Sequence, residues 1–177
     1  MSRRAVFLDR DGVLNAIVPR GDVVSSPRTL DELQIEPDAP QALGRLRDAG
    51  FRLFVVTNQP DVSRGKMTAA ALEAIHQRLA AALPVEAILA CLHDNADACA
   101  CRKPKPGLLL DLAARHALDL ADSWMVGDQD RDIDCGRAAG VRTVLLGRPY
   151  NSGARASADA TTATLSQAVD AILGVDG

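Results

Sequence analysis

The chain has 177 residues, enough for one domain with a full hydrophobic core and too few for two comfortable ones. Apolar residues make up 47% of it but aromatic residues only 3%, so we expect a globular core built from aliphatic side chains. The net charge is -3, and neither a basic patch nor a long apolar run occurs. These features argue against nucleic-acid binding, a membrane span and a secretory leader, and we expect a cytoplasmic protein.

Short apolar runs alternate along the chain with longer segments in which apolar residues recur at helical spacing. The short runs predict five buried strands, at residues 5–9, 51–57, 85–91, 123–127 and 141–146. Helices are expected between them, from Asp38 to Gly50, from Thr68 to about Leu83, from Pro106 to about Ala117, at 133–139 and at 165–173. This order predicts an α/β fold, a Rossmann-like three-layer sandwich with a mainly parallel five-stranded sheet, in one domain over residues 1–177.

Two segments fall outside this alternation. Residues 17–37 are long and irregular, and we expect them to form a flap over a binding site. Residues 147–162 are rich in Gly, Ser, Ala and Thr, which predicts a mobile loop. His76 lies in the middle of a predicted helix, on a mixed face, and we expect it to be exposed to solvent.

Polar side chains gather where the predicted strands end. Asp9 and Asp11 follow the first strand. Thr57 and Asn58 close the second strand, and Asp128 follows the fourth. Because ligands of open parallel sheets bind beyond the carboxyl ends of the strands, the sequence predicts a binding site at this edge.

Asp9 and Asp11 together supply the chemical groups that phosphoryl transfer requires. Transfer to a carboxylate needs an oxygen nucleophile and an acid for the leaving alkoxide, and two aspartates can divide these tasks. Gly12 accepts a positive φ and lets the chain turn after them. Mg²⁺ needs few protein oxygen ligands, and Asp128 can supply one, with Asp132 in a supporting position. The alternative, that these aspartates only form turns and cap helices, loses weight once Asp128 is considered together with Lys103.

Four segments, in order, resemble the signatures of the haloacid dehalogenase superfamily of phosphatases. They are F-L-D-R-D-G-V-L-N (7–15), V-V-T-N-Q (55–59), R-K-P-K-P-G (102–107) and M-V-G-D-Q-D-R-D (125–132). The resemblance implies that Asp9 is the nucleophile and a Mg²⁺ ligand, and that Asp11 is the general acid/base, with its backbone carbonyl on the metal. It further implies that Thr57 and Lys103 hold the phosphoryl group and that Asp128 completes the metal site.

A second cluster consists of soft metal ligands. Cys91 and His93 are followed, after five residues, by Cys99 and Cys101. Three thiolates and one imidazole form a closed tetrahedral set, the usual form of a structural Zn²⁺ site, so we expect a zinc loop at residues 91–101. The loop is expected to position Arg102 and Lys103, which follow it directly, whereas Asp94 and Asp97 are expected to be solvated.

The zinc loop also resembles a subgroup without a large cap domain, which contains the heptose bisphosphate and histidinol-phosphate phosphatases. The short spacing after the histidine is similar to the histidinol-phosphate branch. The segment T-N-Q-P-D-V-S-R-G-K-M-T (57–68) is more similar to the heptose branch. That branch usually continues T-N-Q-S-G and often carries a lysine after the fourth-motif aspartate, so Pro60, Asp61 and Gln129 of this chain depart from its pattern. Substrate contacts are expected from Asn58, Gln59, Arg64 and Arg102.

The resemblance as a whole implies Mg²⁺-dependent hydrolysis of a phosphomonoester through an aspartyl-phosphate. The expected substrate is a small phosphorylated metabolite, D-glycero-D-manno-heptose 1,7-bisphosphate, which loses its 7-phosphate. The alternatives are histidinol phosphate, another sugar phosphate, and a zinc-stapled binding module with a vestigial site. We expect a monomer or a weak oligomer.

Overall fold

The fold centres on a parallel sheet with strand order β5-β4-β1-β6-β7-β8. The structure is a computed structural model that describes residues 3–153 and 157–175. The strands are β1 (Ala5–Leu8), β4 (Arg52–Asn58), β5 (Ala87–Cys91), β6 (Trp124–Gly127), β7 (Arg142–Leu146) and β8 (Ala160–Thr162). Every neighbouring pair is parallel, which confirms the predicted α/β fold with its Rossmann-like sheet.

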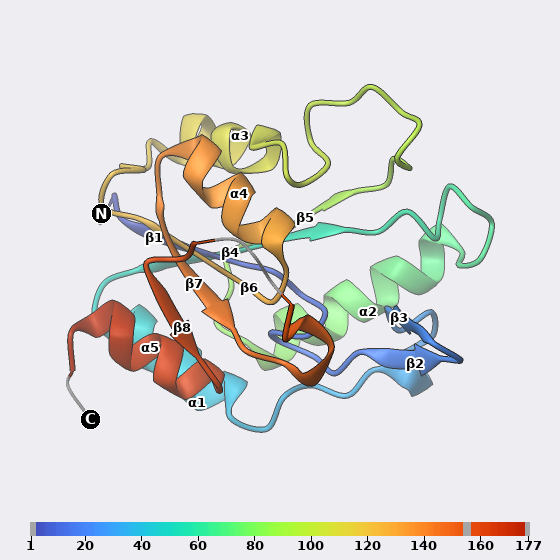
Figure 1. Cartoon of the computed structure of the whole chain (residues 1–177), viewed down its shortest axis with the longest axis horizontal. Helices are drawn as coiled ribbons and strands as arrows, with labels where there is room; N and C mark the ends of the chain where they lie inside the picture. Colours follow the sequence, from blue (N-terminus) through green and yellow to red (C-terminus); the bar gives the residue numbers. More distant parts are fainter. Residues whose placement is uncertain (1–2, 154–156, 176–177) are drawn as a thin grey trace.

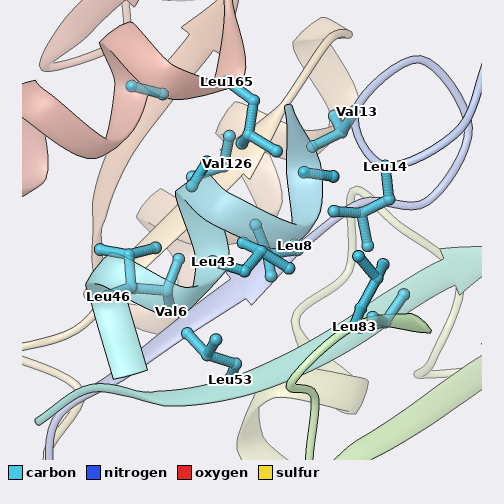
Figure 2. Close-up of a cluster of buried hydrophobic side chains, with 14 of the residues drawn as sticks. Val6, Leu8, Val13, Leu14, Leu43, Leu46, Leu53, Leu83, Val126 and Leu165 are labelled. Carbon is cyan, nitrogen blue, oxygen red and sulfur yellow. The ribbon is translucent and has the colours of Figure 1, made fainter. Parts of the chain in front are cut away.

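Helices cover both faces of the sheet, so the molecule has three layers (Figure 1). One face carries α1 (Ala39–Asp48), α2 (Ala69–Ala82) and α5 (Leu165–Leu173), and the other carries α3 (Gly107–His116) and α4 (Asp130–Ala139). Each face has its own buried cluster. The first contains Val6 and Leu8 of β1, packed against Leu43 and Leu46 of α1 (Figure 2), and the second contains alternate β1 residues with α3 and α4. Because successive residues of a strand point to opposite faces, four apolar residues of β1 serve both layers.

None of the helices within residues 3–153 and 157–175 combines the length and the apolar character that a membrane crossing requires.

Local signals in the sequence account for most helix ends. Thr68 is the N-cap of α2, and its side chain accepts a hydrogen bond from the backbone N–H of Ala71. Gly140 ends α4 in the left-handed conformation. Asp38 occupies the N-cap of α1 without a capping hydrogen bond, because its carboxylate instead accepts the hydroxyl of Ser166 over 3.0 Å. That contact joins α1 to the start of α5.

The sheet has six strands rather than the predicted five. The additional strand, β8, lies inside the segment 147–162 that was expected to be a mobile loop, which also contains the 3-10 helix η2 (Pro149–Asn151). Asp159 accepts hydrogen bonds from the backbone N–H and the hydroxyl of Thr143, over 2.7 and 2.9 Å, and so fastens the segment beside β7. Residues 154–156 of the predicted loop lie outside the described residues.

The predicted flap is partly regular. Residues 17–37 contain the antiparallel hairpin of β2 (Val18–Arg20) and β3 (Val23–Ser25), followed by the 3-10 helix η1 (Leu30–Glu32). Arg20 of the hairpin forms an ion pair with Glu32 of η1 at 2.6 Å. Ser26, between hairpin and helix, donates a hydrogen bond to Asp11 over 2.8 Å, so the flap is attached to the carboxyl edge of the sheet.

Candidate active site

Three aspartates, two from strand ends and one from a helix, meet at the carboxyl edge of the sheet. Asp9 follows β1 and Asp128 follows β6, and these two strands are hydrogen-bonded neighbours. Asp132 lies in the first turn of α4. One carboxylate oxygen of each residue lies within 4.8 Å of the others, and all three side chains are buried.

Lys103 is the cation that faces this cluster. Its Nζ lies 2.8 Å from Oδ1 of Asp9 and 2.7 Å from Oδ1 of Asp132, and it also donates to the carbonyl of Val56 over 2.9 Å. Burial acts to lower the pKa of Lys103, but the charges of Asp132 and Asp9 outweigh it and raise that pKa. A fully charged ammonium group is therefore fixed against Asp9.

One ammonium group does not balance three carboxylates. Burial, together with the charges of Asp132 and Asp11, raises the pKa of Asp9 despite the presence of Lys103. Burial and the charges of Asp9 and Asp132 raise the pKa of Asp128 to about 8. Such shifts indicate a site short of positive charge.

A divalent metal ion fits this deficit. Oδ1 of Asp128 is buried and, within the part of the chain that the structure describes, has no hydrogen-bond partner. Oxygen ligands from clustered carboxylates are the ligands that Mg²⁺ prefers, and Mg²⁺ needs only one or two of them beside waters and a phosphate. Asp9, Asp128 and Asp132 can therefore hold a metal.

The side chain of Asp11 lies apart from this cluster and is surrounded by donors. Oδ1 accepts from Nε and Nη2 of Arg10 and from Nδ2 of Asn15, at 3.0 to 3.1 Å. Oδ2 accepts from Ser26 and from Nε2 of Gln59, both over 2.8 Å. Burial acts to raise the pKa of Asp11, but the charge of Arg10 and these hydrogen bonds leave it below its usual value.

Gly12 makes the turn after Asp11 possible. Its φ is +83°, as the sequence predicts, and a Cβ atom at this position would collide with the carboxylate of Asp128 and the hydroxyl of Tyr150. Only glycine combines this backbone conformation with so close an approach.

The residues expected at the end of the second strand are all present at the site, where they contact one another and Lys103. The hydroxyl of Thr57 is buried and accepts from Gln59 over 2.9 Å. Asn58, which also lines the pocket described below, exchanges two hydrogen bonds with the backbone of Lys103, at 3.0 and 3.1 Å, and so fixes the lysine. Gln59 bridges Thr57 and Asp11. Asn58 and Gln59 thus fix neighbouring residues of the site, and both also line the pocket.

A pocket of about 310 Å³ opens above Asp9 and Asp11. Its lining includes the carboxylates of Asp9, Asp11 and Asp61. The lining also includes six cationic side chains, those of Arg28, Arg64, Lys66, Arg102, Lys103 and Arg131. The excess of cations favours an anionic ligand.

Arg64 and Arg102 line the pocket, and each is held by a contact that the sequence did not predict. Arg64 pairs with Asp94 at 2.5 Å, so Asp94 is not simply solvated as expected. The hydrogen bond from Arg64 is the main cause that holds the pKa of Asp94 below its usual value. Arg102 donates to Asn95 over 3.0 Å and to the carbonyl of His93 over 3.1 Å. Residues of the segment 91–101 therefore hold both arginines.

The four expected soft ligands converge. Sγ of Cys91, Nδ1 of His93, and the Sγ atoms of Cys99 and Cys101 lie within 4.8 Å of one another. His93 Nδ1 lies 3.4 Å from the sulfur of Cys91 and 3.2 Å from that of Cys101. The cysteines form no disulfide, and this donor set suits a tetrahedral metal ion with soft ligands.

The residues that sequence analysis missed come from the flap and from the segment after β7. Tyr150 donates its hydroxyl to Oδ2 of Asp128 over 2.5 Å, and Arg148 donates twice to the carbonyl of Gly12, over 3.0 and 2.8 Å. No local signal distinguishes these two residues in a stretch whose composition indicated only a loop.

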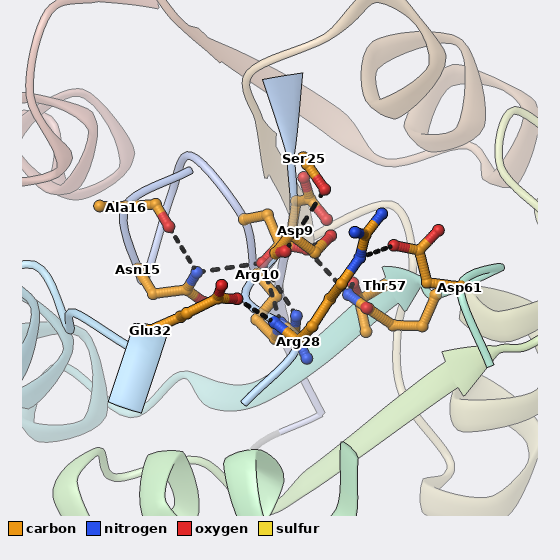
Figure 3. A network of polar contacts seen from close by, with 12 residues as sticks. Asp9, Arg10, Asn15, Ala16, Ser25, Arg28, Glu32, Thr57 and Asp61 are labelled. Carbon is orange, nitrogen blue, oxygen red and sulfur yellow. Dashed lines mark hydrogen bonds and ion pairs between the residues drawn. The ribbon is translucent and has the colours of Figure 1, made fainter. Parts of the chain in front are cut away.

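Asp61, one of the departures from the heptose-branch pattern, also has an unexpected partner. Its Oδ2 accepts from Nε of Arg28, which lies in the flap, over 2.8 Å. Figure 3 shows Arg28 extending toward Asp61 close to Asp9, Arg10 and Thr57. The ion pair joins the flap to the segment after β4 at the rim of the pocket.

Comparisons with known proteins agree with this geometry. A family model described as HAD-hydrolase-like matches residues 100–171. The D-glycero-β-D-manno-heptose-1,7-bisphosphate 7-phosphatase of Pseudomonas aeruginosa is 38% identical, with 86% of this chain and 91% of the relative covered. The enzyme of the same name from Escherichia coli K12 is 35% identical, with 88% and 86% covered. The crystal structure of D,D-heptose 1,7-bisphosphate phosphatase from B. bronchiseptica, complexed with magnesium and phosphate, matches with a TM-score of 0.82 at 32% identity, over 98% of this chain and 99% of that one.

Proposed function

The chain belongs to the HAD-like hydrolases and is a phosphatase, and from this premise we propose that it removes the 7-phosphate of D-glycero-D-manno-heptose 1,7-bisphosphate. The observation that carries the proposal is the position of Asp9 and Asp11 at the floor of a pocket with six cationic side chains. The similarity of the chain to heptose bisphosphate phosphatases over most of its length supports the choice of sugar.

The proposed reaction proceeds in two steps at Asp9. A carboxylate oxygen of Asp9 attacks phosphorus, and the bond from phosphorus to the sugar oxygen breaks while Asp11 gives a proton to that oxygen. Asp11 then takes a proton from water, which attacks the aspartyl-phosphate and releases inorganic phosphate from Asp9. The charge of an incoming phosphate raises the pKa of Asp11 and so favours the protonated form needed in the first step.

The surrounding residues stabilise the transferring group. Lys103, held 2.8 Å from Asp9, offers a fixed positive charge at no reorganisation cost. Thr57, near the end of strand β4, is the proposed donor of a hydroxyl hydrogen bond to a phosphoryl oxygen. When bound by Asp9, Asp128 and the backbone carbonyl of Asp11, with Asp132 in support, Mg²⁺ neutralises charge on the phosphoryl group.

The charge of the pocket distinguishes the two substrates that the sequence left open. A heptose bisphosphate carries a second phosphate, which can meet cations beyond Lys103, such as Arg64 and Arg102. Histidinol phosphate carries an ammonium group at the corresponding end, which the same cations repel. The basic lining therefore favours the bisphosphate, with another sugar phosphate as the alternative.

The zinc loop and the domain organisation complete the proposal. A structural Zn²⁺ on Cys91, His93, Cys99 and Cys101 would fix the loop that presents Arg102 and Lys103. We take residues 1–177 as one catalytic domain that acts in the cytoplasm, as a monomer or weak oligomer. A binding module with a vestigial site is disfavoured, because each expected catalytic residue is present and in contact with its neighbours.

Release of inorganic phosphate from heptose bisphosphate and from histidinol phosphate, with Mg²⁺, tests the proposal. We expect a much higher kcat/KM for the bisphosphate, and no activity in Asp9→Asn with either compound. A preference for histidinol phosphate would overturn the substrate, whereas full activity of Asp9→Asn would overturn the mechanism.

A further inference from the structure

The guanidinium group of Arg10 is completely buried beneath the active site. Its Nε and Nη2 donate to Oδ1 of Asp11, and its Nη1 lies 3.1 Å from Nε2 of His76. A guanidinium group is always charged and can only donate, so Nε2 of His76 must be the acceptor. The ring is therefore neutral, with its proton on Nδ1.

His76 is suited to keep this acceptor role. It lies on α2 and is partly buried rather than exposed as the sequence suggested. Burial and the charge of Arg10 lower its pKa to about 4, although Glu73 and Asp11 act in the opposite direction. At neutral pH the lone pair of Nε2 remains available to Arg10.

The two oxygens of Asp11 have different surroundings. Oδ1 receives two hydrogen bonds from Arg10 and one from Asn15, and Arg10 itself is fixed by His76. Oδ2 receives its hydrogen bonds from Ser26 of the flap and from Gln59. A side chain anchored through one oxygen can exchange the partners of the other, so Oδ2 is the oxygen available for proton transfer.

We propose that His76 is a positioning residue, which acts through Arg10 to hold Oδ1 of Asp11 so that Oδ2 stays in line with the leaving oxygen. The inference rests on the proposed function, in which Asp11 is the acid of the first step. In that step the proton passes from Oδ2 to the sugar oxygen as the bond from phosphorus to that oxygen breaks. In the second step Oδ2 takes a proton back from the attacking water.

A purely structural role of His76 would have a different signature. If His76 only satisfied the buried charge of Arg10, its loss would loosen the whole site and slow all substrates equally. Protonation by Asp11 matters for a sugar alkoxide, which is a poor leaving group, and hardly matters for p-nitrophenolate, which departs without a proton. The ratio of the two activities therefore isolates the position of the acid.

The test measures kcat/KM, which reports the steps up to formation of the aspartyl-phosphate, on an alkyl phosphate and on p-nitrophenyl phosphate for the wild type, His76→Leu and His76→Gln. For His76→Leu, which fills similar space without an acceptor, we expect about a tenfold loss on the alkyl substrate and less than about a twofold loss on p-nitrophenyl phosphate. His76→Gln offers an amide oxygen to Arg10 and should restore most of the alkyl activity. Gln77→Ala, an exposed neighbour on α2, is the matched control and should leave both activities unchanged.

Equal losses on both substrates in His76→Leu, or no loss on either, would overturn the proposal. If His76→Leu does not fold, His76→Ala and His76→Gln are compared in its place. A His76→Gln enzyme as impaired as His76→Ala on the alkyl substrate would likewise overturn it. The result is independent of the natural substrate, because any alkyl phosphate that the wild type hydrolyses serves; a wild type that prefers a sugar other than heptose would alter only the proposed function.

Discussion

The hydroxyl of Tyr150 donates a hydrogen bond to Oδ2 of Asp128 over 2.5 Å, while Oδ1 of the same carboxylate is buried and, within the described residues, has no donor. One oxygen of Asp128 is thus oriented by a segment from beyond β7, and the other is left for a cation. Hydrogen bonds of this kind to metal-binding carboxylates fix their direction and contribute to metal affinity. The segment also closes on the site through Arg148 and the carbonyl of Gly12.

Tyr150→Phe should weaken the binding of Mg²⁺ with little change in the chemistry. The ring remains and the hydroxyl is lost, so we expect the half-saturating Mg²⁺ concentration to rise about tenfold and kcat at saturating Mg²⁺ to stay near that of the wild type. Phosphate release as a function of Mg²⁺ concentration, together with calorimetric titration of Mg²⁺, gives both quantities. An unchanged half-saturating concentration would show that Tyr150 does not orient Asp128.

Asp128 should make the stability of the metal-free protein depend on pH. Its pKa is about 8 in the folded state against an ordinary value of 3.8, so the folded protein keeps a proton that the unfolded chain releases. The resulting stabilisation is complete below about pH 4 and is lost as the pH rises to about 8, at no more than about 1.4 kcal/mol per pH unit. Mg²⁺ binds the deprotonated carboxylate, so its stabilising effect should grow over the same interval.

Urea unfolding in EDTA at several pH values, for the wild type and Asp128→Asn, measures this dependence. The free energy of unfolding of the wild type, minus that of the variant, is expected to fall from pH 5 to pH 8. A difference that stays flat or rises would contradict the raised pKa.

Loss of the Zn²⁺ proposed to bind residues 91–101 should impair substrate binding and leave the Mg²⁺ site intact. Cys99→Ser removes one of four clustered ligands, so we expect the bound Zn²⁺ measured by metal analysis to be lost and the KM for the sugar phosphate to rise, because Arg102 is held by the backbone of His93. The half-saturating Mg²⁺ concentration should not change. Cys135→Ser is the matched control. Cys135 lies outside the cluster, so this variant should retain the bound Zn²⁺. Full activity and stability in a zinc-free protein would refute the positional role.

Arg28 and Asp61 should support substrate binding only as a pair, so that loss of either residue has the same effect on KM as loss of both. The side chains are 26% and 11% exposed, so the pair is screened less than a surface pair. We expect Arg28→Ala and Asp61→Ala each to raise KM about fivefold, and the double variant to raise it no further than one single variant does. The exposed pair of Arg47 and Asp48 supplies the control cycle, in which KM should not change. Multiplicative effects at Arg28 and Asp61 would show that the two residues act separately.

Much of this protein could be predicted from the sequence because the relevant signals are local. Apolar runs predicted the bounds of β1, β4 and β6, the strands that carry or precede Asp9, Thr57 and Asp128, to within one or two residues. The parallel arrangement of those strands then brings their carboxyl ends together. The four soft ligands lie within eleven residues, so their spacing alone indicated a metal site. In each case a short stretch of chain carries both the residue type and its geometry.

Contacts between distant segments were decided only by the tertiary structure. Tyr150 meets Asp128 and Arg28 meets Asp61 because the segments after β7 and before α1 fold back over the sheet edge, and neither segment has a periodic pattern that would predict it. His76 was expected to be exposed because helical spacing describes only its own helix, whereas its burial depends on Arg10 of another element. The sequence by itself thus determined the parallel sheet, the aspartates at its edge and the cluster of three cysteines and one histidine. The tertiary structure decided which side chains hold those aspartates in place, since such contacts depend on how loops of irregular sequence pack against one another.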